Sequence, residues 1–164
     1  MFVLSCNLGQ RFSDMVRIEK SCFDLIKNTF RIIQKKTGNL SIVNLDKYCL
    51  DKRTTLEILN KYNFEAPYKG DISCYDKYLK MLLKFIGEEF FNEIRVEEKV
   101  NGELLVQQLY KYKMVSSHTA RRTFATINLE RGHLVQNIKR ATGHKTISAF
   151  EKYICFSDSD FEFS

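Results

Sequence analysis

The sequence has 164 residues, of which 44% are hydrophobic and 28% are charged, and its formal net charge is +6. This length and composition are those of one globular domain with a core of its own, and they exclude a fibrous or disordered chain. No stretch approaches the length of a membrane-spanning helix and no signal peptide opens the chain, so we expect a cytoplasmic protein with no membrane partner.

The hydrophobic pattern, taken in chain order, predicts an α+β protein that is mostly α and has small β-hairpins. Asn101-Gly102 is the strongest short signal for a hairpin turn, and Gly143 is expected to end the helix before it. The expected elements are a helix over Arg11–Ile18, a hairpin of Phe30–Gln34 and Leu40–Leu45 joined by Lys35–Asn39, a helix that begins near Asp46 and continues over Thr54–Tyr62, a loop near Asn63–Asp71, a helix over Cys74–Phe85, a second hairpin over Glu93–Leu109, and helices over Ser117–Glu130, Val135–Thr142 and Thr146–Ile154.

The cysteines and histidines show no pattern of metal ligands. The five cysteines are an odd number and form no CxxC pair, which favours reduced thiols over disulfides or a zinc site. The three histidines lack metal-ligand spacing as well, so we expect neither a metal nor a cofactor. The excess of 26 Lys and Arg over 20 Asp and Glu favours a polyanionic partner.

A set of polar residues matches what the cleavage of a phosphodiester requires. Its negative charge repels nucleophiles and its leaving alkoxide is poor, so a catalyst supplies cationic donors, a nucleophile in line and an acid. Arg11 and Arg121 offer planar, permanently charged forks for the phosphate oxygens. His118 lies three residues before Arg121, on the same face of a helix. His144 follows Arg121 by 23 residues, and Tyr153 follows His144 by nine.

These residues, with Gly9-Gln-Arg11-Phe-Ser-Asp14 and with Lys36 in a Lys-Lys-Thr-Gly turn, resemble the tyrosine recombinases of the phage integrase family. The closest likeness is to the integrases of Bacteroides-type mobile elements. The resemblance runs from about Gly9 to Tyr153. It implies that residues 1–164 form the catalytic domain, with small β-hairpins, and that the N-terminal core-binding domain of such enzymes is absent.

The resemblance also implies a role for each catalytic residue. Tyr153 is the nucleophile, which leaves a 3′-phosphotyrosine and a free 5′-hydroxyl. Lys36 is the general acid toward the 5′-oxygen, with Lys35 as the neighbouring alternative. His118 is a hydrogen-bond partner and proton acceptor near Tyr153. His144 donates a hydrogen bond to a non-bridging oxygen, beside the two arginines.

Four further residues are expected to support this site. Asp14 matches the acidic residue that often follows the first arginine in the family, and it is expected to orient a neighbouring cation. Lys111, Lys113 and Arg122 flank the His118 helix, so they are candidates for contacts to the phosphates of the DNA backbone.

The function implied is site-specific recombination of double-stranded DNA, by integration or excision of a mobile element. A tetramer on paired DNA sites and accessory DNA-bending proteins are the partners expected beyond the DNA itself. Two alternatives remain at this stage. A type IB topoisomerase-like enzyme would use the same chemistry to relax supercoils, and a non-catalytic remnant would only bind DNA.

Overall fold

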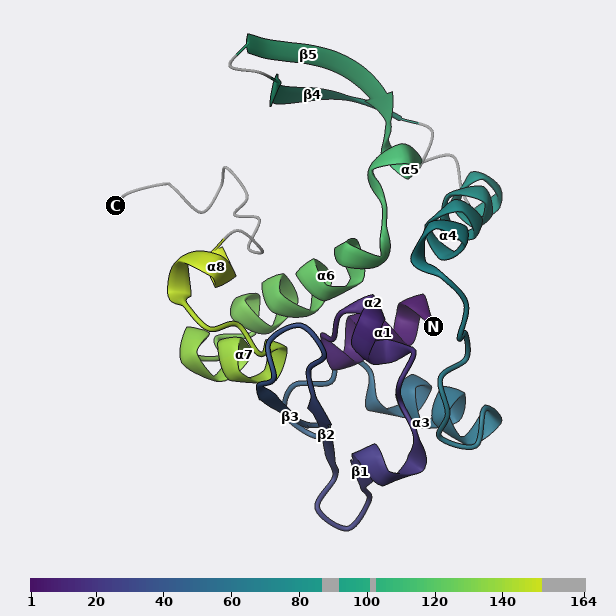
Figure 1. Cartoon of the computed structure of the whole chain (residues 1–164), viewed down its shortest axis with the longest axis vertical. Coiled ribbons are helices and arrows are strands. Elements are labelled where there is room, and N and C mark those ends of the chain that lie inside the picture. Colours follow the sequence, from purple (N-terminus) through teal and green to yellow (C-terminus); the bar gives the residue numbers. More distant parts are fainter. Residues whose placement is uncertain (87–91, 101–102, 152–164) are drawn as a thin grey trace. The chain divides into compact units, whose positions relative to one another are not determined.

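The computed structural model describes residues 1–86, 92–100 and 103–151 (Figure 1). The chain divides into two compact units. The first unit comprises Met1–Lys69 and Ser117–Ser164, and the second comprises Gly70–Ser116. Each unit is described by itself below.

Two helices from opposite ends of the chain form the centre of the first unit. Helix α1 (Phe2–Leu8) packs on α6 (Ser117–Glu130), and α3 (Lys52–Lys61) also contacts α1. Asp51 caps α3, because its side chain accepts a hydrogen bond from the backbone N–H of Thr54 at 3.0 Å. The other helices among the described residues of this unit are α2 (Phe12–Met15), the short 3₁₀ helix η1 (Lys20–Cys22), α7 (Val135–Thr142) and α8 (Ile147–Glu151).

A three-stranded antiparallel sheet adjoins these helices. Its strands are β1 (Phe23–Asp24), β2 (Thr29–Ile33) and β3 (Leu40–Asn44), in that order. Strands β2 and β3 pair from Thr29 opposite Asn44 to Ile33 opposite Leu40, and α7 contacts β3. One face of β2 is buried, since its side chains alternate between the core and the solvent.

The core of the first unit joins the sheet to the helices. Burial of these apolar side chains supplies most of the free energy that holds α1, α6 and α7 against the sheet. The fully buried members include Leu4, Leu8, Phe30, Val43, Phe124, Ile138 and Phe150.

The second unit contains a helix and a β-hairpin. Helix α4 (Ile72–Ile86) contacts the short helix α5 (Lys111–Met114), where Tyr112 is buried and the Lys84 ammonium lies 5.0 Å from its ring centroid. Strands β4 (Glu93–Val100) and β5 (Glu103–Tyr110) pair antiparallel. The predicted turn at residues 101–102 lies outside the described residues.

The structure confirms the mostly α, α+β class with small antiparallel sheets. It corrects two boundaries: the first predicted helix is shorter and ends at Met15, and residues 46–51 are not helical, because Asp51 starts α3 as its cap. Helix α1 and strand β1 were not predicted. The predicted helix over Thr146–Ile154 is described as far as Glu151. None of the helices that the structure describes is long and apolar enough to cross a membrane.

Candidate functional site

Arg121 is the buried centre of the candidate site. Its side chain on α6 is 0% exposed. Its Nη1 donates a hydrogen bond to the backbone oxygen of Gly9 at 3.1 Å, and its Nη2 lies 3.1 Å from Nε2 of His144. One guanidinium therefore connects three segments that are far apart in the sequence, and its fork is held in a fixed direction.

The turn at Gly9 lets Arg11 approach this centre. Gly9 ends α1 with a φ of +64°, and a Cβ at this position would lie 2.5 Å from a ring carbon of Phe124 on α6. Glycine therefore allows both the left-handed turn and the close packing of α1 against α6. Arg11 follows in extended backbone and begins α2.

Two buried glutamines hold Arg11 and the hairpin in place. Nη1 of Arg11 donates to Oε1 of Gln34 at 2.6 Å, and Nε2 of Gln34 donates to Oε1 of Gln10 at 2.9 Å and to the backbone oxygen of Thr142 at 2.7 Å. Gln10 in turn donates to the backbone oxygen of Ala141 at 3.0 Å. This glutamine pair links the Arg11 turn, the end of β2 and the end of α7.

Neither glutamine was predicted as a site residue from the sequence. The sequence does contain a signal for Gln34. Side chains of a strand alternate between two faces, and Gln34 follows the buried Phe30 and Ile32 at intervals of two residues, so it extends the buried face of β2. A buried glutamine at the end of a strand needs partners for its amide, which would have marked it as part of a polar network. Gln10 lies in a turn, where no periodicity indicates its burial.

His144 lies directly after α7, which ends at Gly143 with a φ of +67°. Its Nδ1 is 2.8 Å from Oγ1 of Thr142, and its ring meets that of Phe150 edge-on at 5.5 Å between centroids. Burial, followed by the charges of Arg121 and Arg11, lowers the pKa of His144 to about 3. The imidazole is therefore neutral at physiological pH.

We expect Gly143→Ala to destabilise the fold far more than Gly38→Ala. A Cβ at Gly143 would lie 2.3 Å from Oε1 of Gln34, whose amide is fixed by its hydrogen bonds, whereas a Cβ at Gly38 meets nothing within 4 Å. Both positions have positive φ, so both variants carry ~1–2 kcal/mol of backbone strain. Only Gly143→Ala adds ~1–3 kcal/mol of overpacking. Urea denaturation of the two variants measures the difference, and equal losses would contradict the geometry.

The stability of the protein should fall as the pH decreases below 6.5, partly because of His144. The unfolded chain takes up a proton at the ordinary histidine pKa of 6.5, but folded His144 does so only near its pKa of about 3. The unfolded state therefore binds more protons in this window, and the free energy of unfolding decreases toward acid pH. Urea denaturation at about pH 7 and about pH 5 should show a smaller decrease for His144→Gln than for the unchanged chain. An unchanged decrease would remove His144 as its source.

His118 lies on α6 one turn before Arg121 and is exposed. Its pKa is lowered by desolvation first, then by the charges of Arg121, Arg11, Arg122 and Lys36. The ring therefore lies in a field of positive charge, to which both arginines and Lys36 contribute. A neutral imidazole in this position can accept a proton.

Asp14 holds the hairpin that carries the lysines. It is fully buried on α2, and its Oδ1 accepts a hydrogen bond from the backbone N–H of Lys35 at 2.7 Å. The same oxygen lies 3.5 Å from Nη1 of Arg17, which also donates to the backbone oxygen of Ile33. The cation beside Asp14 is thus Arg17, which was not predicted from the sequence. Lys36, next along the turn, is exposed.

The structure brings five of the predicted residues into one region of the first unit, at the ends of α1, β2 and α7 and on α6: Arg11, Lys36, His118, Arg121 and His144. Tyr153 lies outside the described residues. Arg122 is exposed on α6, and its charge reaches His118. Lys111 and Lys113 are exposed on α5 in the second unit, and their contact with DNA stays a prediction.

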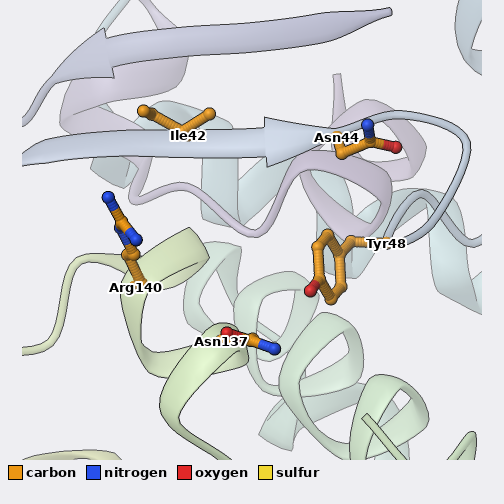
Figure 2. Close-up of a pocket in the computed structure, with 5 residues that line it drawn as sticks. All are labelled: Ile42, Asn44, Tyr48, Asn137 and Arg140. Atoms are coloured by element: carbon orange, nitrogen blue, oxygen red, sulfur yellow. The ribbon is translucent and has the colours of Figure 1, made fainter. Parts of the chain in front are cut away.

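A separate pocket of about 280 Å³ lies between β3 and α7 (Figure 2). Its lining consists of Ile42 and Asn44 of β3, Tyr48, and Asn137 and Arg140 of α7. None of the predicted site residues is among them. Within residues 1–86, 92–100 and 103–151, no group of three or more His, Cys, Asp or Glu side chains could hold a metal ion.

The region therefore combines two arginines, two histidines and a lysine on a mostly helical α+β unit. This set of side chains is suited to binding the phosphate of a phosphodiester. The sequence matches the phage integrase family over residues 1–159, and the chain belongs to that family. The phage integrase family consists of tyrosine recombinases.

Two solved structures share the fold. The crystal structure of XerA recombinase has 18% sequence identity and a TM-score of 0.60, with 96% of this chain and 52% of that chain covered. The structure of the Tn1549 transposon integrase in complex with circular intermediate DNA has 14% identity and a TM-score of 0.53, with 97% and 53% covered. This chain therefore spans about half the length of either protein. A comparison with curated protein sequences gave no match. The fold is that of a tyrosine recombinase catalytic domain, as the sequence predicted.

Proposed function

We propose that residues 1–164 are the catalytic domain of a Bacteroides-type mobile-element integrase that cuts and rejoins double-stranded DNA. The observation that carries this proposal is the fixed guanidinium of Arg121, which is buried between Gly9 and His144 while Gln34 holds Arg11 nearby. The DNA in the Tn1549 integrase structure supports DNA as the partner. Family membership supports recombination as the outcome.

The two arginines bind the scissile phosphate. Each guanidinium is held through one edge by the protein, by Gly9 and His144 for Arg121 and by Gln34 for Arg11. Donors that are oriented before the substrate arrives stabilise the charge that builds up on the non-bridging oxygens without further reorganisation. The glutamine pair therefore supports catalysis by helping to keep the two guanidinium groups oriented toward one phosphate.

Tyr153 attacks the phosphorus, and the bond from phosphorus to the 5′-oxygen breaks. The phenol proton passes to His118, which is neutral because its pKa is lowered. Lys36 gives a proton to the departing 5′-oxygen. The product is a 3′-phosphotyrosine and a free 5′-hydroxyl, and the reverse attack by a 5′-hydroxyl rejoins the strand. The covalent bond conserves the energy of the phosphodiester, so rejoining needs no ATP.

Lys36→Ala should slow cleavage of ordinary DNA but not of DNA with a 5′-bridging phosphorothiolate. A thiolate leaves without a proton, so the loss of a general acid does not slow cleavage of that substrate. On ordinary DNA, general acid catalysis typically raises the rate by about 10²–10⁴-fold. The measurement is the single-turnover cleavage rate on both substrates, with Lys35→Ala as the matched variant at the adjacent exposed position. If Lys36→Ala is equally slow on both substrates, Lys36 is not the acid, and Lys35 becomes the candidate.

A covalent-complex assay tests the proposed function. The substrate is nicked DNA with the recombination site of the mobile element that encodes this chain. A nick next to the cleavage site lets the 5′ fragment diffuse away, so the covalent complex accumulates and can be counted on a denaturing gel. Strand exchange between two defined sites supports a recombinase, and relaxation of any supercoiled plasmid supports topoisomerase-like activity. DNA binding with no covalent complex would support a non-catalytic role instead.

The assembly follows from the same proposal. Exchange of strands between two DNA sites requires four cleavage events, so we propose a tetramer on paired sites, helped by accessory DNA-bending proteins. Mass measurement of complexes with one site and with two sites would reveal the stoichiometry.

A further inference from the structure

Thr142 and His144 form a hydrogen-bonded chain with Arg121. Nη2 of Arg121 lies 3.1 Å from Nε2 of His144, and Nδ1 of His144 lies 2.8 Å from Oγ1 of Thr142. The Thr142 hydroxyl is also 2.8 Å from the backbone oxygen of Ile138. Thr142 is 0% exposed and His144 is 6% exposed, so these contacts are formed away from bulk water.

The chemistry of the guanidinium fixes the direction of this chain. Arginine has only donors and stays charged, so Nε2 of His144 must present its lone pair to Arg121. A neutral imidazole then carries its hydrogen on Nδ1. Thr142 has a single hydroxyl hydrogen, which the backbone oxygens of Ile138 at 2.8 Å and Lys139 at 3.2 Å can accept. The Thr142 oxygen then accepts the Nδ1 hydrogen.

We propose that Thr142 is a positioning residue that holds His144 in the tautomer with hydrogen on Nδ1, so that Nε2 faces Arg121 as an acceptor. Each donor in the chain then has an acceptor: Arg121 donates to His144, His144 donates to Thr142, and Thr142 donates to the backbone of α7 at Ile138 or Lys139. The opposite tautomer would set two donors against each other at Nε2, and its unprotonated Nδ1 would compete with the two backbone oxygens for the Thr142 hydrogen.

This tautomer has a consequence that rests on the proposed function. In the absence of DNA, His144 is an internal acceptor that orients Arg121. It cannot donate to a phosphate oxygen through Nε2 until that nitrogen gains a proton. The described charged and titratable groups around the ring are Arg121 and His118 on α6, Arg11 before α2 and Lys139 on α7, and all of them oppose a positive charge on His144. The negative charge of a bound phosphate would reduce this opposition.

Nitrogen-15 NMR of the DNA-free protein tests the tautomer directly. The chain has three histidines, so spectra of His118→Gln and His133→Gln identify the signals of His144 by elimination. We expect a protonated Nδ1, an unprotonated Nε2, and slow exchange of the Nδ1 hydrogen with water at neutral pH. A protonated Nε2 in the unchanged chain would overturn the proposal without the need for any Thr142 variant.

Two Thr142 variants separate positioning from packing. Thr142→Ser keeps the hydroxyl and should preserve the protected Nδ1 hydrogen, whereas Thr142→Val keeps the shape of the side chain and should lose it. An unchanged His144 spectrum in folded Thr142→Val would also overturn the proposal. If the valine variant does not fold, the spectra of the unchanged chain and of Thr142→Ser still decide the outcome.

A kinetic measurement extends the test to catalysis. Thr142→Val should slow single-turnover cleavage by about 10²-fold, the lower range for the loss of one oriented charge donor, with Thr142→Ser close to the unchanged rate. If the tautomer is found but no chain cleaves DNA, the proposed function fails and the role of Thr142 in the free protein stands. If cleavage occurs and both variants are equally slow, the hydroxyl does not act through His144, and the proposal is wrong.

Discussion

Tyr153→Phe should abolish the covalent complex with DNA and leave DNA affinity nearly unchanged. The substitution removes only the oxygen that attacks phosphorus, so no other group at the same position can form the ester. The chain reaches Tyr153 nine residues after His144, and the start of that segment is held at the site, because Phe150 of α8 is fully buried against the His144 ring. Denaturing gels of nicked substrate measure the adduct, and titration of labelled DNA measures affinity.

Tyr48→Phe provides the matched control for this prediction. It removes the same atom from a tyrosine that lines the pocket between β3 and α7 (Figure 2), and no predicted catalytic residue lines that pocket. We expect this variant to form the covalent complex at the unchanged rate. A covalent complex that persists in Tyr153→Phe would mean that another side chain is the nucleophile, and the assignment of Tyr153 would be wrong.

Local sequence patterns predicted the elements that depend on neighbouring residues. The β2–β3 hairpin was predicted because two β-prone runs flank a short turn, and the end of α7 was predicted from Gly143. The start of α3 was placed too early. The pattern before Asp51 suits a helix, but the Asp51 carboxylate accepts the Thr54 N–H and fixes the helix start there.

Candidate site residues could be proposed from the sequence, but their connections could not be predicted. Arg121 and His144 stand out by residue type and order, yet their 3.1 Å contact depends on how α6 and α7 pack. The glutamine pair depends on contacts across more than 100 residues, such as that of Gln34 with Thr142. Such contacts leave no periodic signal. Family resemblance supplied the roles, and tertiary structure supplied the hydrogen bonds that orient the side chains.

Arg121→Ala should reduce the rate of cleavage by more than a single donor would. Loss of one oriented donor typically costs about 10²–10³-fold, and a guanidinium supplies both several donors and a full charge. The free energy of unfolding should also decrease, because the Gly9 oxygen and Nε2 of His144 each lose a buried donor, and a buried group without its partner costs ~1–3 kcal/mol. Thermal unfolding of each variant is therefore measured as well, so that cleavage rates are compared only between proteins that are folded under the assay conditions.

Arg122→Ala is the control that separates catalysis from general attraction to DNA. Arg122 has the same charge and is adjacent on α6, but it is exposed whereas Arg121 is buried. We expect Arg122→Ala to weaken binding in a salt-dependent way and to leave the rate on saturating DNA close to the unchanged value. The pKa of His144 should rise in Arg121→Ala, because the charge of Arg121 helps to lower it. If Arg121→Ala cleaves DNA at a rate within about tenfold of the unchanged chain, the effect is smaller than the loss of even one donor. Arg121 would then stabilise the fold and would not act on the phosphate.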